Sequence, residues 1–335
     1  MQCARRAFGW PYPASMSSPY IAWLDEAAGS GARETIGGKG ASLATMLAAG
    51  FPVPPGFAVT VEGYKRFLEG NEIGEIDLGP ESLKDIQAAA RLAERVCGQL
   101  SACSLPDDLR LEILEALDTL GSRVGTEVYA VRSSAVGEDS GEASFAGLYE
   151  TYLNARDGES VLRNVQACFV SLWSGRAIHY RSLKDLDHGR EAMAVVVMEM
   201  VQSEAAGVAF TVNPVSGDKD QIVINSTWGL GEAVVQGIVS PDMFTLDKGS
   251  LEILSSEIFA KDVAIVPDPD GGPTTVEVAV EEPRASEPSL AAEQVVDVAR
   301  LARDVEQHYG SPQDVEWALA GGRLYLLQAR PVTAL

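Results

Sequence analysis

Long apolar runs are missing from this sequence, and their absence argues against a membrane-spanning helix. A span needs roughly 20 consecutive apolar residues, and no stretch of the 335-residue chain approaches that length. The N-terminus carries Arg5 and Arg6 but lacks the apolar segment of roughly 7–15 residues that a signal peptide requires. We therefore expect no membrane contact and a cytoplasmic location.

Cysteine, histidine and positive charge are also scarce. The four cysteines form no CxxC pair and have no neighbouring histidine, so reduced thiols are expected. The three histidines, His179, His188 and His308, lack the sequence partners typical of nucleophilic catalysis or metal binding. With 26 Lys and Arg against 48 Asp and Glu, the net charge of −22 disfavours nucleic acid as a partner. Any anion site must be built locally from a few basic residues.

Chain length and local patterning indicate two lobes of mixed structure. A chain of 335 residues is too long for one compact core. A largely helical first half, a mixed second half and a closing hairpin indicate an α+β (α/β) protein. We expect a loose N-terminal extension over 1–18, a first lobe over 19–190 and a second lobe over 191–335.

Near the end of the chain, residues 314–332 have the pattern of a β-hairpin. Their sequence, DVEWALAGGRLYLLQARPV, places strand-forming residues on both sides of Ala320-Gly321-Gly322, and a proline follows the second strand. A three-residue loop at this turn would pair Leu319 with Arg323.

Three polar residues of this hairpin are expected to share one face. Alternate residues of a strand point the same way, so Gln328 and Arg330 lie together, and the expected pairing adds Glu316. A carboxylate, an amide and a guanidinium on one face suit a metal ion that bridges to phosphate oxygens, with the arginine holding the phosphate. The alternative is an edge hairpin with a solvated polar face.

Two upstream segments have the composition of phosphate sites. Gly37-Gly38-Lys39-Gly40 is expected to form a glycine-rich turn before a short helix, where backbone amides and one ammonium can approach an anion. It lacks the GxxxxGK[ST] spacing of a P-loop, and it can also be a plain flexible turn. Arg132-Ser133-Ser134 leaves a strand and can hold phosphate, or Arg132 can simply pair with a nearby acid.

The buried strand predicted over 195–201 could present backbone groups to an adenine edge, although a plain core strand is the commoner interpretation. Glycine-rich turns follow at 213–217 and 228–232, and glycine usually serves only the turn. Glu232 in the second turn could assist a metal, but with so many acids in the chain an ordinary carboxylate is the simpler explanation.

Taken in order, six segments resemble the ATP-binding domain of phosphoenolpyruvate synthases and their relatives, pyruvate phosphate dikinase and rifampin phosphotransferase. The segments are IGGKGASL (36–43), AGFPVPPGFAVT (49–60), VRSSAVGEDS…SFAGLYET (131–151), GVAFTVNPVSGD (207–218), WGLGEAVVQGIVSPD (228–242) and DVEWAL…LYLLQARPV (314–332). The resemblance extends from about residue 19 to the end of the chain.

This resemblance implies a two-lobed ATP-grasp fold that closes on ATP and Mg²⁺. By position it implies Lys39 and Arg132 on the phosphates, Gly147 and Thr151 in the closing loop, Met198 facing adenine, Glu316 and Gln328 on Mg²⁺, and Arg330 on phosphate. Arg132 and Arg330 are the implied catalytic residues. Met198 departs from the family pattern, which usually has glutamine at this position.

The resemblance also implies an enzyme, an ATP-dependent phosphotransferase similar to the pyruvate, water dikinases. Family members continue into a phosphohistidine carrier domain, whereas this chain stops at Leu335, and its histidines match no carrier motif. We therefore expect a module that passes phosphoryl from ATP to a histidine on a separate protein. The alternatives are a stand-alone kinase or ligase acting on a small molecule, and a non-catalytic nucleotide-binding remnant. The acceptor, the nucleotide product and the oligomeric state stay open.

Overall fold

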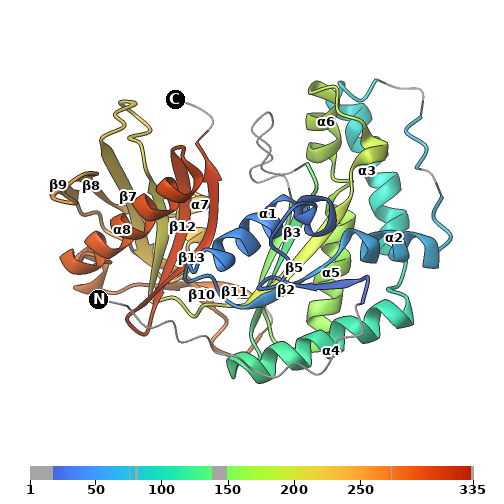
Figure 1. Ribbon diagram of the computed structural model, residues 1–335, viewed down its shortest axis with the longest axis horizontal. Helices are drawn as coiled ribbons and strands as arrows, with labels where there is room; N and C mark the ends of the chain where they lie inside the picture. The colour runs from blue at the N-terminus through green and yellow to red at the C-terminus, as the bar shows by residue number, and fades with distance from the viewer. Residues whose placement is uncertain (1–17, 75, 80–81, 138–148, 273, 333–335) are drawn as a thin grey trace.

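The computed structural model shows two large β-sheets side by side, each with its own helices (Figure 1). It describes residues 18–74, 76–79, 82–137, 149–272 and 274–332. A five-stranded sheet has the order β1-β2-β5-β3-β4, and a six-stranded sheet has the order β13-β12-β6-β7-β8-β9. This mixture of helices and sheets confirms the α+β class.

We name the five-stranded sheet with its helices the first lobe, and the six-stranded sheet with its helices the second lobe. The strands of the first lobe are β1 (Ile21–Trp23), β2 (Gly56–Val59), β3 (Tyr129–Ala135), β4 (Thr151–Ala155) and β5 (Met193–Glu199). Its helices are α1 (Ala32–Ala48), α2 (Val61–Gly70), α3 (Ile86–Ser101), α4 (Asp107–Val124), α5 (Gly158–Ser171) and α6 (Gly175–Leu183). A short 3₁₀ turn, η1 (His188–Arg190), precedes β5.

The second lobe contains the six-stranded sheet and a separate two-stranded hairpin. Its strands are β6 (Ala205–Phe210), β7 (Gln221–Trp228), β8 (Asp242–Asp247), β9 (Ile253–Glu257), β10 (Val263–Pro267), β11 (Thr275–Ala279), β12 (Gln313–Ala320) and β13 (Arg323–Pro331). Its helices are α7 (Glu232–Val235) and α8 (Ala292–Tyr309), with a 3₁₀ turn, η2 (Arg284–Ser286).

The chain passes from one sheet to the other after β5. Because β5 lies in the middle of the five-stranded sheet and β6 begins the six-stranded one, the passage falls at residues 200–204. No helix among the residues placed by the structure is long and apolar enough to cross a membrane.

Helix α8 follows from its sequence pattern. Val295, Val298, Ala302 and Val305 recur at a spacing of three or four residues, and all four are buried. The helix packs on β6, β7 and β12, and it ends at Gly310, which adopts the left-handed conformation with a φ of 71°. The helix therefore packs its apolar face against the six-stranded sheet, on the side of the sheet seen in Figure 1.

The glycine-rich segment around Lys39 is not the turn expected from the sequence. Gly37 to Gly40 lie inside α1, and the helix is kinked at Gly37, whose φ is 73°. A Cβ atom at Gly37 would lie 2.0 Å from the carbonyl oxygen of Ser134. Glycine therefore allows α1 to lie directly against β3, a contact that local sequence pattern does not reveal.

A fully buried ion pair connects β8 to the loop that precedes β10. Nζ of Lys261 lies 2.6 Å from Oδ1 of Asp242, and neither side chain is exposed. Asp242 also accepts hydrogen bonds from the backbone N–H and the hydroxyl of Ser289, both at 2.7 Å. Satisfied in this way, the buried carboxylate fixes three segments of the second lobe relative to one another.

We expect Lys261→Met to destabilise the protein by about 3–5 kcal/mol, because it leaves the buried Asp242 charge without its cation. The matched control is Arg300→Met, which breaks an exposed pair with Asp297 and should cost at most about 1 kcal/mol. Urea unfolding followed by circular dichroism measures both values. Equal losses of stability in the two variants would show that the buried pair contributes no more to stability than the exposed pair.

Candidate functional site

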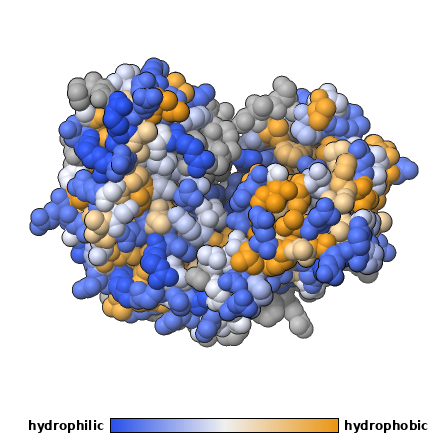
Figure 2. Space-filling view, turned by 180° about the vertical axis from the view of Figure 1, so that it is seen from behind, coloured by the Kyte–Doolittle hydropathy of each residue, from blue (hydrophilic) through white to orange (hydrophobic). Residues whose placement is uncertain are grey.

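A cleft of about 800 Å³ lies between the two sheets. The hollow between the two halves of the molecule is visible from behind in Figure 2. All the site residues predicted from the sequence that the structure describes line this cleft, namely Lys39, Arg132, Thr151, Met198, Glu316, Gln328 and Arg330. Gly147 lies outside the described residues. Residues more than 270 positions apart in the chain thus share one cavity.

The closing hairpin has a different turn from the one expected. Ala320 pairs with Arg323, so the loop contains only Gly321 and Gly322. Both glycines have a positive φ, 56° and 72°, which is typical of a tight type I′ turn. The expected pairing of Leu319 with Arg323 is therefore wrong.

A β-bulge corrects the register of the hairpin. Trp317 pairs with Leu326 but Glu316 pairs with Gln328, which leaves Leu327 without an opposite residue. Without this extra residue, Glu316 would face Leu327 and Gln328 would point to the other side of the sheet. The bulge thus puts Glu316 and Gln328 directly opposite each other on the cleft face.

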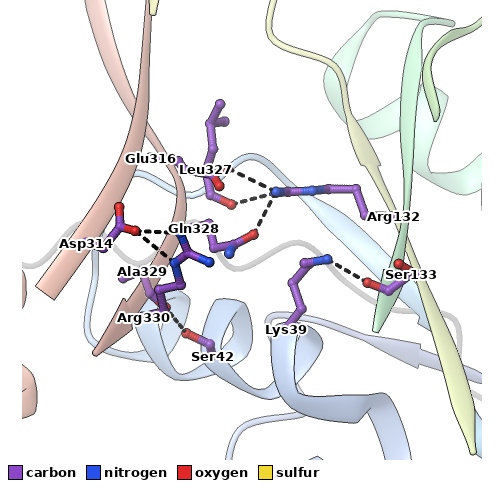
Figure 3. A network of polar contacts seen from close by, with 10 residues as sticks. All are labelled: Lys39, Ser42, Arg132, Ser133, Asp314, Glu316, Leu327, Gln328, Ala329 and Arg330. Atoms are coloured by element: carbon purple, nitrogen blue, oxygen red, sulfur yellow. Dashed lines mark hydrogen bonds and ion pairs between the residues drawn. The ribbon is translucent and has the colours of Figure 1, made fainter. Parts of the chain in front are cut away.

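Arg132 crosses the cleft and binds this part of the hairpin (Figure 3). From β3, its Nη1 donates to the carbonyl oxygen of Leu327 at 2.7 Å. Its Nη2 donates to Oε1 of Gln328 at 2.8 Å and to Oε2 of Glu316 at 3.2 Å. One cationic group therefore lies between the carboxylate and the amide that were predicted as metal ligands.

Lys39 lies on the first-lobe side of the same cleft. The side chain is buried, and Nζ donates to the carbonyl oxygen of Ser133 at 2.7 Å. Gly40 N–H donates to Oγ of Ser134, which in turn donates to the carbonyl oxygen of Ile36. The Ser133-Ser134 pair, predicted as part of a phosphate cradle, therefore fixes α1 and its lysine against β3.

Arg330 is held by Asp314, a residue that the sequence analysis did not select. Nε and Nη2 of Arg330 both donate to Oδ2 of Asp314, at 2.8 and 2.6 Å. Asp314 precedes Glu316 by two residues and so shares its face of β12, a signal that could have identified it from the sequence. The pair orients the guanidinium at one end of the cleft.

Thr151 and Met198 complete the first-lobe wall. Thr151 pairs with Arg132 across β4 and β3, which puts it beside the arginine. Met198 is buried in β5 between Gly56 and Ala130 on the neighbouring strands. The chain continues into Glu199, Met200 and Val201, which also line the cleft.

Two further carboxylates of the cleft have raised pKa values because they are partly buried. Burial raises the pKa of Glu199, and the charge of Arg323 partly offsets the increase. Burial also raises the pKa of Glu232, and a hydrogen bond from Thr275 partly offsets it. Glu199 was not selected from the sequence, and Glu232 was considered an ordinary carboxylate. Both face the cavity rather than open solvent.

Behind the cleft wall, His188 is buried and tightly bonded. Nε of Arg181 donates to its Nδ1 at 3.2 Å, and its Nε2 lies 3.0 Å from Oγ of Ser182. Arg181 also donates to the hydroxyl of Tyr149, a cleft-lining residue. Burial, and then the charge of Arg181, lower the pKa of His188 from 6.5 to about 4. His188 therefore supports the wall as a neutral ring.

The stability of the protein should fall as the pH drops from about 6.5 towards about 4, the window between the ordinary and folded pKa values of His188. In this window the unfolded chain binds a proton that the folded chain does not bind, so acid favours unfolding. Urea midpoints at pH 7 and pH 4.5 measure the effect.

The variant His188→Asn keeps an acceptor for Arg181 and should show a smaller loss of stability over this window. The control His308→Asn replaces an exposed ring elsewhere and should leave the loss unchanged. The same loss in wild type and His188→Asn would contradict the assignment.

Two sheets enclose a cleft in which lysine and arginine side chains lie close to carboxylate and amide oxygen atoms. This arrangement defines the class of protein. Over residues 33–335 the chain matches the family "Pyruvate phosphate dikinase, AMP/ATP-binding domain". The chain belongs to this family, as its motifs indicate.

Curated relatives agree with this family. The chain is 42% identical over 326 residues to a probable phosphoenolpyruvate synthase of Methanocaldococcus jannaschii, covering 95% of this chain and 27% of the relative. It is 38% identical to the phosphoenolpyruvate synthase of Pyrococcus furiosus, covering 96% of this chain and 44% of the relative. It is 40% identical to a rifampicin phosphotransferase of Streptomyces, covering 96% of this chain and 36% of the relative. The chain thus spans less than half the length of these relatives.

Proposed function

We propose that the chain binds Mg·ATP in the cleft, as a two-lobed ATP-grasp domain, and positions its phosphates for transfer. The observation that carries the proposal is the set of contacts made by Arg132 across the cleft. A cation from one lobe meets a carboxylate and an amide from the other within hydrogen-bond distance. Lys39 and Arg330 line the same cavity, so basic groups are concentrated here in a chain of net charge −22.

The residues present fit a magnesium ion. Oε2 of Glu316 and Oε1 of Gln328 already converge on one cationic atom, Nη2 of Arg132. Carboxylate and amide oxygens are hard ligands, and Mg²⁺ commonly takes one or two protein ligands with waters and substrate phosphates completing its shell. Bound there, the ion would neutralise charge on the phosphate oxygens.

The protein's own side chains would bind and orient the triphosphate. Arg132 and Arg330 present planar guanidinium groups, which match two oxygens of a phosphate at once. Asp314 holds Arg330 through two hydrogen bonds, so its orientation is set before a phosphate arrives. Lys39 adds a point charge, and an ammonium with three N–H donors can bind a phosphate oxygen beside the Ser133 carbonyl. Phosphoryl transfer depends mainly on such positioning and charge neutralisation.

The adenine is proposed to lie against the end of β5. Met198, Glu199, Met200 and Val201 line this part of the cleft, and they lead into the passage between the sheets. Met198 offers a polarisable thioether where the family usually has an amide. Adenine recognition would then depend on backbone groups and on packing.

We propose that the phosphoryl acceptor is a histidine on a separate carrier protein. His179, His188 and His308 are the three histidines of the chain, and none of them lines the cleft. The relatives named as phosphoenolpyruvate synthases are more than twice as long as this chain. Their additional residues are long enough to form domains for other steps of such a reaction.

Calorimetry with Mg·ATP tests the binding site. Lys39→Ala and Arg132→Ala should each weaken binding by roughly tenfold to a hundredfold, because each removes a charge-assisted contact to phosphate. Glu316→Ala should reduce the gain in affinity that Mg²⁺ brings. The control Glu293→Ala removes an exposed carboxylate of α8 and should bind like wild type. Unchanged Mg²⁺ dependence in Glu316→Ala would contradict the metal role.

Product analysis tests the acceptor. The chain is incubated with Mg·ATP alone and with a candidate phosphohistidine carrier protein. We expect AMP, inorganic phosphate and a phosphorylated carrier only when both proteins are present, and none of these products with Arg330→Ala. ADP together with a phosphorylated small molecule, formed without any carrier, would contradict the carrier and favour direct phosphorylation.

A further inference from the structure

Glu232 lies where the passage between the sheets, the β10–β11 hairpin and the cleft meet. It follows β7 and a tight turn at Gly229, whose φ is 74°. Gly229 N–H donates to the carbonyl oxygen of Glu204 in the passage, and Leu230 N–H donates to that of Ile265 in β10, at 3.0 and 2.8 Å. A Cβ atom at Gly229 would lie 2.4 Å from the Ile265 oxygen. These contacts fix the backbone immediately before Glu232.

The carboxylate of Glu232 is also fixed. The hydroxyl of Thr275, the first residue of β11, donates to its Oε2 at 3.1 Å. Glu232 lines the cleft and is partly buried, and burial raises its pKa. A partly buried carboxylate facing a cavity and held by one donor is suited to accept further hydrogen bonds from a bound molecule.

The hairpin that carries Thr275 is attached to the first lobe. Asn154 of β4 is fully buried, and its Nδ2 donates to the carbonyl oxygens of Gly272 and Thr274 at 2.8 and 2.6 Å. Asn154 lies three residues after Thr151 in the same strand. The β10–β11 hairpin thus connects the lobes at a second place, and it positions Glu232 relative to the strand that borders the phosphate end.

The turn after β7 brings Glu232 back over the start of β6. A Cβ atom at Gly231, the residue before it, would lie 3.7 Å from Cβ of Ala206 and 3.9 Å from the backbone nitrogen of Gly207. These two residues follow directly on the passage between the sheets, whereas Glu316 pairs with Val208, further along β6. Glu232 therefore lies towards the passage, which is the proposed nucleoside end of the cleft.

We propose that Glu232 binds the ribose hydroxyl groups of the nucleotide and makes the cleft selective for ribonucleotides. The inference rests on the proposed binding of ATP. An ionised carboxylate only accepts hydrogen bonds, and the ribose hydroxyls are the neutral donors between the phosphates and the base. Thr275 acts as a positioning residue, because it orients the carboxylate and does not itself need to touch the sugar.

Calorimetry with Mg·ATP and Mg·2′,3′-dideoxy-ATP, which lacks both hydroxyls, tests the sugar contact. Wild type should bind ATP at least about tenfold more tightly than the dideoxy analogue, as expected for hydrogen bonds to a charged group. Glu232→Ala should bind the two nucleotides equally, with its affinity for the dideoxy analogue unchanged. The control Glu257→Ala removes an exposed carboxylate of β9 and should keep the wild-type ratio.

Thr275 variants test the positioning role. Thr275→Val removes the hydroxyl while keeping the shape and should reduce the ratio between ATP and its dideoxy analogue, and Thr275→Ser should restore it. A general loss of folding in Thr275→Val would instead weaken the binding of both nucleotides equally.

The outcomes separate this inference from the proposed function. Failure of wild type to bind any Mg·nucleotide would overturn the binding site itself. Tight binding of ATP with a wild-type ratio in Glu232→Ala would overturn only the sugar contact. Inosine triphosphate, which lacks the amino group of adenine, tests whether Glu232 instead accepts a hydrogen bond from that amino group. If Glu232→Ala abolishes discrimination between ATP and inosine triphosphate, the carboxylate binds the base and the sugar assignment is wrong.

Discussion

The guanidinium of Arg132 joins the two lobes, and the geometry of the site depends on it. The arginine extends from β3, which is flanked on both sides by other strands of its sheet, so its origin is rigid. Its partners are the carbonyl oxygen of Leu327 and the side chains of Glu316 and Gln328. A nearly buried cation is costly unless it is paired and hydrogen-bonded. These three acceptors satisfy it, and they fix the spacing across the cleft.

The bulge in the closing hairpin is what makes this contact possible. The unpaired residue, Leu327, shifts the register by one, so that Glu316 and Gln328 share the cleft face, and its carbonyl oxygen accepts from Arg132. A single extra residue therefore positions two side chains and also supplies one of the hydrogen-bond acceptors of Arg132. Bulges often redirect side chains in this way beside functional sites.

Much of the fold and the site could be predicted from the sequence. The α+β class, helix α8 and the shared face of Glu316 and Gln328 followed from residue spacing and alternation. The expected cause of this shared face was wrong, because a two-residue turn and a bulge set the register in place of the expected three-residue loop. Neither periodicity nor turn composition reports an unpaired residue inside a strand.

Other features depend on tertiary contacts that local sequence does not encode. The kink at Gly37 exists because β3 lies against α1, and the conformation of the segment is therefore helical rather than a turn. The position of Asp314 two residues before Glu316 places it on the cleft face, but only the contact with Arg330 shows what it does there. Glu232 looked like one acid among many, and only the contacts of Gly229, Leu230 and Thr275 show that it is held facing the cleft.

A crystal structure of the chain with Mg²⁺ and a non-hydrolysable ATP analogue tests the central claim most directly. We expect the ion on Oε2 of Glu316 and Oε1 of Gln328, with the guanidinium of Arg132 turned from these oxygens to a phosphate and Arg330 still held by Asp314. A nucleotide bound outside the cleft would contradict the account. So would a bound nucleotide with no ion at Glu316 and Gln328.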